Sequence, residues 1–283
     1  MVELAERIGL DSIWVGDHLL YRGDGRPARG PWEVWSILAA IAAVTERVEI
    51  GPLVASTSFH NPAMLAKKAA TIDEISGGRL VLGLGAGWNE AEYRAFGFPF
   101  DHRVSRFEEA FTIIRTLLAT GSCDFHGSYY DLDNSELIPR GPRPEGPPLL
   151  IGSNGERMLS IALPYVAAWN SWFESFGNTV EGYRVLRDGI DDACRRAGRA
   201  PTEVDRTVAL FVTFDDPAGR ALGARPVPDV PAIGGDPATL ARALRAFAAE
   251  GVGHVQLVLD PITLDSIEAL QPSLAALDAP PEG

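Results

Sequence analysis

The chain has 283 residues, of which 46% are hydrophobic, so it can bury a sizeable core in one large α/β barrel or two smaller domains. Its formal charge of -13 at pH 7 argues against nucleic acid or an anionic membrane as a partner. Cys123 and Cys194 lie far apart in the chain and the five histidines lack a zinc-binding spacing, so we expect no metal. With no signal peptide and no long apolar run, we expect a cytoplasmic protein.

Short apolar runs alternate with amphipathic segments along the whole chain, and this alternation predicts strands connected by helices. The predicted strands cover residues 12–15, 48–54, 80–84, 148–151, 167–170, 207–213 and 254–259. The predicted helices cover residues 33–45, 63–75, 104–118, 156–163, 180–197 and 237–250. For the last of these helices, Asp236 is the expected N-cap and Pro237 the first helical residue.

This alternation favours an α/β fold, a (β/α) barrel forming one domain over residues 1–283, with a doubly wound sheet as the alternative. An insertion is expected at residues 120–147, where residues 127–131 are suited to a small hairpin. A second irregular stretch covers 215–231, and the end from 278 is expected to fray. In such a barrel the active site lies at the carboxyl ends of the strands.

Two stretches run from an apolar strand into a glycine turn that opens a helix. The first carries Gly85 and Gly87, and the second carries Gly152, Ser153, Asn154 and Gly155. Glycines at the end of a buried parallel strand let backbone N–H groups approach an anion, so this arrangement indicates binding of a phosphate-bearing cofactor. Helix capping is a second explanation for Ser153 and Asn154.

The motifs Gly9-Leu-Asp-Ser-Ile-Trp-Val-Gly-Asp-His18, Asn61-Pro-Ala-Met-Leu-Ala-Lys67, Ile75-Ser-Gly-Gly-Arg-Leu80 and Gly85-Ala-Gly-Trp88 resemble the luciferase-like monooxygenase superfamily over essentially the whole chain. The segments 92–97, 125–130 and 251–254 are similar to its branch that uses the deazaflavin coenzyme F420. This resemblance implies a TIM-type (β/α)8 barrel, often a homodimer. Family members begin with a strand that has no counterpart here, so we expect the first strand to be missing and hypothesise a truncated start.

His18 follows the predicted strand 12–15, where an imidazole can act as a general acid or base. The resemblance implies that this ring faces the cofactor, whereas a capping or simply buried histidine is the alternative. Asp17 points to the opposite face of the extended chain, so the two residues form no facing dyad. By resemblance Asp17 positions the cofactor, and a structural carboxylate at the rim is the other interpretation.

The segment 51–55 corresponds to a family strand with a bulge and a non-proline cis peptide behind the deazaflavin ring. The resemblance places that bond between Pro52 and Leu53, with Ala55 as a further cofactor contact, and an ordinary bulge is the alternative. It also implies that the segment 152–155 is the phosphate loop. Arg157 is expected either to neutralise phosphate charge or to pair on the surface.

Trp88 is expected to line the substrate cavity or contact the cofactor ring, because an indole packs well along a ring system. Relatives that oxidise sugar phosphates carry a glutamate at this place, which argues against a glucose-6-phosphate type of reaction. We expect the nearby Glu90 and Glu92 to be solvated helix carboxylates. An aromatic group after the sixth family strand lines an apolar pocket or packs in the core: Trp169, Trp172, Phe173 and Phe176.

The resemblance thus implies an oxidoreductase that exchanges a hydride between coenzyme F420 and a small organic substrate, with His18 handling the proton. One alternative is an FMNH2-dependent monooxygenase that uses the same cavity with FMN. Another is a noncatalytic flavin-binding or assembly protein, since part of the cofactor floor is expected to be missing.

Overall fold

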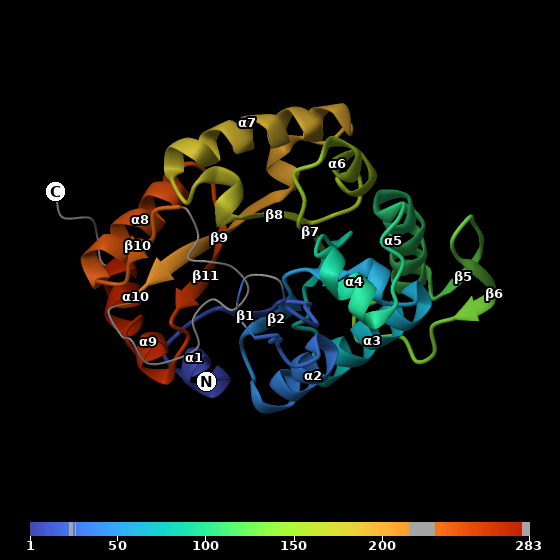
Figure 1. Cartoon of the computed structure of the whole chain (residues 1–283), viewed down its shortest axis with the longest axis horizontal. Helices are drawn as coiled ribbons and strands as arrows, with labels where there is room; N and C mark the ends of the chain where they lie inside the picture. The colour runs from blue at the N-terminus through green and yellow to red at the C-terminus, as the bar shows by residue number, and fades with distance from the viewer. Residues whose placement is uncertain (23–24, 26, 215–229, 279–283) are drawn as a thin grey trace.

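The computed structural model describes residues 1–22, 25, 27–214 and 230–278. Strands and helices alternate as the sequence predicts, and Figure 1 shows their arrangement. The first half contains α1 (Val2–Arg7), β1 (Ser12–Val15), α2 (Val34–Val44), β2 (Glu49–Pro52), β3 (Ala55–Ser56), the 3-10 turn η1 (Thr57–Phe59), α3 (Pro62–Ile75), β4 (Leu82–Gly85), α4 (Glu90–Phe96), α5 (Arg103–Thr120), β5 (Ser122–His126) and β6 (Asp131–Glu136). The second half contains β7 (Leu149–Ile151), α6 (Glu156–Ala162), β8 (Ala168–Trp172), η2 (Phe173–Phe176), α7 (Val180–Arg196), η3 (Pro201–Glu203), β9 (Asp205–Thr213), β10 (Ile233–Gly234), α8 (Pro237–Ala249), β11 (His254–Asp260), α9 (Leu264–Glu268) and α10 (Gln271–Asp278).

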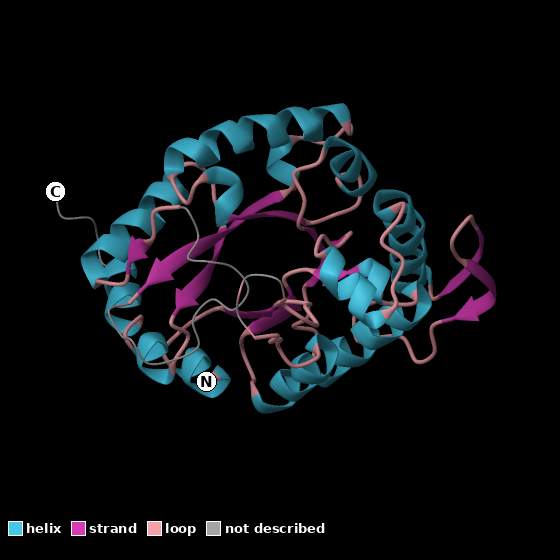
Figure 2. Ribbon diagram, viewed as in Figure 1, coloured by secondary structure: helices cyan, strands magenta, loops and turns pink. Residues whose placement is uncertain are grey.

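Apart from β5 and β6, the strands form parallel pairs that follow their order along the chain. β1 pairs with β2, a bridge between Ile50 and Leu80 leads on toward β4, and β4, β7, β8, β9 and β11 then pair in succession. Figure 2 shows these strands in the interior with the helices around them. A doubly wound sheet reverses its strand order at a switch point. The sequential order therefore confirms a parallel α/β fold and argues against that alternative.

The two edge strands β1 and β11 approach each other through side chains. Ser12 Oγ lies 2.7 Å from His254 Nε2, and the indole N–H of Trp14 donates to the same oxygen at 2.7 Å. Within the described residues no backbone ladder joins these strands. The sheet is thus curved enough to bring its first and last strands into contact.

The expected insertion contains an antiparallel hairpin, which β5 and β6 form. The carboxylate of Glu109 on α5 accepts the backbone N–H groups of Ser128, Tyr129 and Tyr130 at 2.7 to 3.1 Å, and this fixes the hairpin turn. The hairpin expected at 127–131 is therefore confirmed. Most of the irregular stretch 215–231 lies outside the described residues, as do 279–283. The end expected to fray from 278 is preceded by helices α9 and α10, which the sequence reading missed.

The junction of β3, β4 and α4 depends on the missing side chain of Gly87. Tyr93 is fully buried, and its hydroxyl donates to the carbonyl of Ala86 at 2.8 Å and lies 3.1 Å from Ser56 Oγ. A Cβ atom on Gly87 would lie 2.0 Å from the Tyr93 hydroxyl and 2.4 Å from Ser56 Oγ. Gly87 therefore provides the space in which the tyrosine joins the three elements.

Burial lowers the pKa of His254 below its ordinary value, although Glu49, Asp11 and Asp205 oppose the shift. Below about pH 6.5 the unfolded chain therefore binds more protons at His254 than the folded chain does. Through this group, the free energy of unfolding should decrease as the pH decreases in that range. We expect His254→Gln to lose less stability than wild type between pH 7.5 and pH 5.5 in thermal unfolding. His126→Gln, on the exposed hairpin, is a control of opposite sign: the hydrogen bond to Asp131 raises the pKa of His126, so this variant should lose slightly more stability than wild type over the same range. Equal losses in wild type and His254→Gln would contradict the assignment.

Gly87→Ala should lower the free energy of unfolding by about 2 to 4 kcal/mol, because the new methyl group meets buried atoms in a left-handed backbone conformation. Gly97→Ala is the matched control: φ is 74° at Gly87 and 76° at Gly97, but nothing lies within 4 Å of a Cβ atom at Gly97. The control should lose only about 1 to 2 kcal/mol. Chemical denaturation measures both, and equal losses would show that crowding at Gly87 is unimportant.

Candidate functional site

The candidate site lies at the carboxyl ends of adjacent parallel strands. Asp17 and His18 follow β1, and Leu53 and Val54 connect β2 to β3. The segment 86–88 follows β4, and the segment 152–155 follows β7. Because parallel strands end at one edge of the sheet, these segments gather there. The structure thus brings the predicted segments to one edge.

His18 forms a pair with a buried carboxylate. Its Nδ1 lies 3.0 Å and 3.2 Å from the two carboxylate oxygens of Glu92, and Glu92 Oε1 also accepts the N–H groups of Leu19 and Leu20. The Glu92 side chain is 1% exposed and that of His18 is 23% exposed. An ionised carboxylate only accepts hydrogen bonds, so Nδ1 carries the proton and Nε2 of the neutral ring is the acceptor.

The expectation of a solvated Glu92 is therefore wrong, whereas Glu90 is half exposed and pairs with Arg94 at 2.6 Å. Residues two apart on a helix lie on nearly opposite faces, so α4 directs Glu90 to solvent and Glu92 inward. The sequence analysis does not predict Glu92 as part of the site.

Aromatic rings flank His18. The ring centroid of Tyr21 lies 4.9 Å and that of Trp88 5.6 Å from the His18 ring. Trp88 is 51% exposed, so much of its indole is open to a ligand. The structure thus places Trp88 beside His18, and its role in substrate or cofactor contact stays a prediction.

Asp17 contacts a different set of partners from His18. Its Oδ2 accepts the N–H of Ser56 at 2.9 Å and lies 3.0 Å from His60 Nε2. Asp17 is 5% exposed. His60 is a further residue that the sequence reading missed, because 43 positions separate the two residues and no local pattern connects them.

The non-proline cis peptide lies between Leu53 and Val54, one bond after the predicted Pro52–Leu53 bond. Pro52 still belongs to the β2 ladder, opposite Val15, so the irregular backbone begins only after it. Ala55 lies in β3 and is fully buried opposite Leu84.

Val54 fills the space that glycines in β4 and directly after β7 leave open. A Cβ atom on Gly83, Gly85 or Gly152 would lie 2.8 to 2.9 Å from a methyl carbon of Val54. The Val54 side chain thus occupies the space beside Gly85 and Gly152, just as the Tyr93 hydroxyl occupies the space beside Gly87. This packing supplies a structural reason for glycines that the sequence assigns to cofactor binding, and their contact with a cofactor stays a prediction.

The loop 152–155 presents backbone donors at the start of α6. The Ser153 carbonyl accepts the indole N–H of Trp169 at 2.9 Å, and the Asn154 amide donates to Ser171 Oγ at 3.3 Å. Within the described residues the backbone N–H groups of Ser153 and Asn154 have no acceptor. Gly155 is the N-cap residue, with no side-chain cap. The loop is therefore anchored on one side, and its binding of a phosphate stays a prediction.

Arg157 and most of the aromatic group after the sixth family strand have structural contacts, and any further role of these residues stays a prediction. Arg157 pairs with Glu108 at 2.9 Å on the surface. Trp169, Phe173 and Phe176 are buried in the core, whereas Trp172 is 37% exposed. The part of the chain that the structure describes holds no group of three His, Cys, Asp or Glu side chains suited to a metal.

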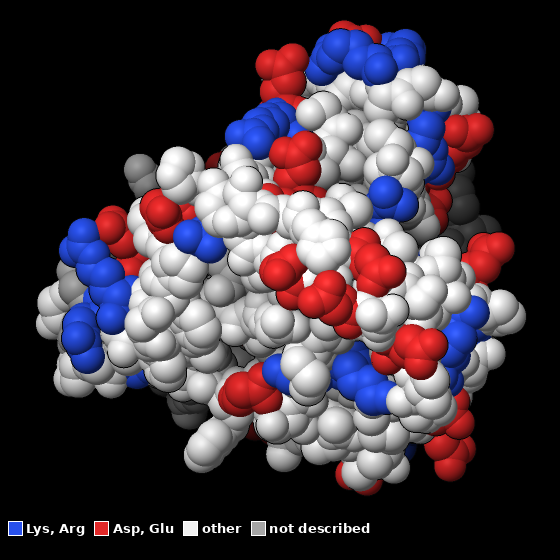
Figure 3. Space-filling model, turned by 90° about the vertical axis from the view of Figure 1, so that its right-hand side faces the viewer, with Lys and Arg blue, Asp and Glu red and all other residues white. Residues whose placement is uncertain are grey.

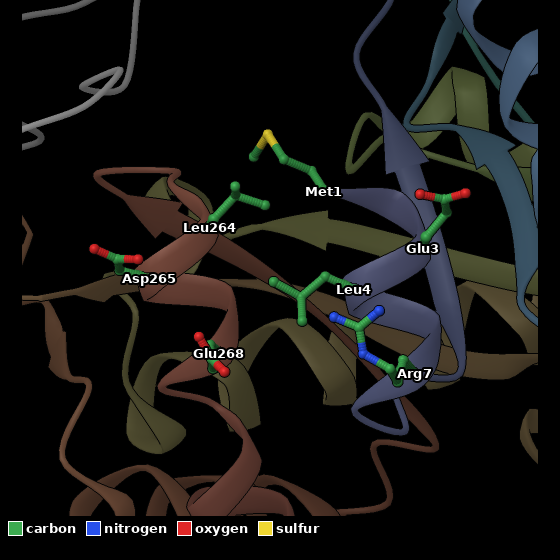
Figure 4. A pocket seen from close by; sticks show the side chains of 7 residues that line it. All are labelled: Met1, Glu3, Leu4, Arg7, Leu264, Asp265 and Glu268. Carbon is green, nitrogen blue, oxygen red and sulfur yellow. The ribbon is translucent and has the colours of Figure 1, made fainter.

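A hollow of about 390 Å3 lies between α1 and α9, and none of its lining residues belongs to the predicted site. Figure 4 shows the side chains that line it. Its lining consists of Met1, Glu3, Leu4, Arg7, Leu264, Asp265 and Glu268. On the face in Figure 3, acidic and basic side chains are scattered among wide uncharged areas. Among the described helices none is long and apolar enough to cross a membrane.

Two solved structures share this fold. An F420-dependent secondary alcohol dehydrogenase with an F420–acetone adduct matches with a TM-score of 0.79 at 19% identity, over 98% of this chain and 93% of that one. A monooxygenase from Streptomyces bottropensis matches with a TM-score of 0.70 at 22% identity, over 98% of this chain and 92% of that one.

Curated relatives match by sequence. An F420-dependent glucose-6-phosphate dehydrogenase of Amycolatopsis mediterranei is 33% identical over 77% of this chain and 65% of its own length. A 5,10-methylenetetrahydromethanopterin reductase of Archaeoglobus fulgidus is 28% identical over 84% of this chain and 67% of its own length. The chain thus spans about two thirds of the length of these relatives. The family model described as luciferase-like monooxygenase matches residues 1–253, and the chain belongs to that family.

Proposed function

We propose that the chain is an oxidoreductase that exchanges a hydride between coenzyme F420 and a small organic substrate. The pair that His18 forms with the buried Glu92 of α4 carries this proposal, because it places a histidine with a fixed tautomer at the strand ends, where the fold positions ligands. F420-dependent enzymes among its relatives support the choice of cofactor. We further infer that the strands follow a TIM-type barrel, as their sequential parallel order and the Ser12–His254 contact support.

The residues at the strand ends fit an anionic ring cofactor. The free N–H groups of Ser153 and Asn154 would hold its phosphate, and Asp17 would position its ring. When bound, the deazaflavin supplies the hydride chemistry, and the protein contributes position and electrostatics. Trp88 would limit the space beside His18 and exclude water from it.

His18 would move the substrate proton at Nε2. Glu92 accepts the Nδ1 proton and so keeps Nε2 available, and its negative charge stabilises the ring when Nε2 gains a proton. The homodimer and the cytoplasmic location remain predictions.

Parallel fluorescence titrations with F420 and with FMN test the cofactor assignment. We expect a dissociation constant for F420 that is micromolar or lower and weak binding of FMN. Tight FMN binding with weak F420 binding would instead favour the FMNH2-dependent monooxygenase. Binding of neither cofactor would contradict both enzymes and favour a noncatalytic assembly protein.

His18→Ala should lower turnover about 10²- to 10⁴-fold while leaving F420 affinity close to wild type, because a positioned acid or base contributes about that much. Glu92→Gln should also lower turnover, because it removes the charge that stabilises protonated His18. Glu90→Gln, on the exposed face of the same helix, is the matched control and should keep wild-type turnover. F420 absorbance measured with a panel of ketones, enones and secondary alcohols reports turnover. Unchanged turnover in His18→Ala would exclude the assigned role.

A further inference from the structure

A row of three buried polar side chains crosses the neighbouring strands β8, β9 and β11. The amide nitrogen of Asn170 on β8 donates to Thr207 Oγ1 on β9 at 2.8 Å and to Gln256 Oε1 on β11 at 2.7 Å. Each of these residues is at most 5% exposed. The amide nitrogen Nε2 of Gln256 is buried as well, and no group in the described residues accepts a hydrogen bond from it.

The polar row faces away from the surrounding helices. Arg206, the residue before Thr207, donates to Asp191 of α7 at 2.7 Å and so points to the helix side of β9. Because successive side chains of a strand alternate, Thr207 points to the opposite, interior side. Asn170 lies opposite Thr207 in the register of β8 and β9, and Gln256 bonds to the same amide, so all three lie on the interior side. The interior of a parallel barrel is usually filled by branched apolar residues, so polar groups there need partners.

The lack of a partner does not depend on how the two amides are oriented. As they stand, Gln256 Nε2 has no acceptor, and across the described ranges no donor reaches Asn170 Oδ1. Turning over Gln256 alone would set two donors against each other. Turning over both amides would let Asn170 accept from Gln256 and Thr207, but it would leave one atom of each amide unmatched at the same two places. A buried polar atom without a partner is unfavourable, so a ligand is expected beside these atoms.

The surroundings of the polar row select the ligand. Ala209, opposite Gln256 in the register of β9 and β11, is buried and leaves room for a small molecule only. Burial lowers the pKa of His254, which precedes Gln256 by two residues on the same side of β11, so an anion would find no counter-charge there. A cation is unsuited to an amide N–H.

We propose that the polar row binds one ordered water molecule inside the sheet. The water accepts from Gln256 Nε2 and from the Thr207 hydroxyl, whose own proton has no other acceptor in the described chain, and it donates to Asn170 Oδ1. Three hydrogen bonds are typical of a buried water. All three residues precede the carboxyl ends of their strands, so this site is separate from the candidate site and does not depend on binding of F420.

Nuclear magnetic resonance tests the proposal in solution, because the chain has only two glutamines, Gln256 and the exposed Gln271. In protein labelled at the side-chain nitrogens of glutamine and asparagine, we expect the Gln256 amide protons to show cross-peaks to water. Opposite signs in NOE and ROE spectra distinguish a bound water from proton exchange. Asn178 is the matched control, since it is 4% exposed and its amide nitrogen donates to the carbonyls of Phe211 and Pro231 at 2.9 Å. Its amide protons should show no such cross-peak.

Gln256→Met assigns the signal, because it removes one of the two glutamine amides and keeps a side chain of similar size. Should this variant fail to fold, Gln271→Glu assigns the remaining amide instead. A crystal structure of the wild type gives the position, and we expect a water oxygen about 2.7 to 3.2 Å from Gln256 Nε2. A protein group paired with Gln256 Nε2, empty density beside an ordered Gln256, or Gln256 amide protons that behave like those of Asn178 would each overturn the inference.

Discussion

The absence of a side chain at Gly87 is the constraint on which the geometry of the site depends. It admits the Tyr93 hydroxyl, which holds the segment after β4 against Ser56 of β3. Tyr93 neighbours Glu92, which binds His18, and Ser56 binds Asp17. One packed junction therefore fixes the partners of both Asp17 and His18, the two residues after β1 that we propose for the site.

Two buried carboxylates contribute to the segment after β1. Asp17 belongs to it, Glu92 contacts its next residue, His18, and each carboxylate accepts hydrogen bonds. Asp17 accepts the N–H of Ser56 and lies 3.0 Å from His60 Nε2, and Glu92 accepts the N–H groups of Leu19 and Leu20 and pairs with His18. A buried charge without such partners would be strongly unfavourable. The backbone donors belong to β3 and to the segment after β1, so the fold itself holds them in place, which explains how these charges are kept without a large loss of stability.

Most of the fold could be predicted because it follows from local patterns. The bounds of β1 agree with the expected 12–15, and Asp236 accepts the N–H of Thr239 as the expected N-cap. The site residues that depend on distant parts of the chain could not be found in this way. His60 and Glu92 acquire meaning only beside Asp17 and His18, 43 and 74 positions away. Glu92 carried a usable signal, since helix geometry turns it away from the exposed Glu90.

The alternation of side chains at the end of β1 also limits how this protein can change in evolution. Asp17 and His18 point to opposite sides of one extended segment and contact different partners. Which side chain reaches which side therefore depends on whether the number of preceding residues in the segment is odd or even. A point substitution here changes one group and leaves the other in place. A deletion or insertion of a single residue before Asp17 would exchange the two sides, so we expect related sequences to vary in residue type in this segment far more readily than in length.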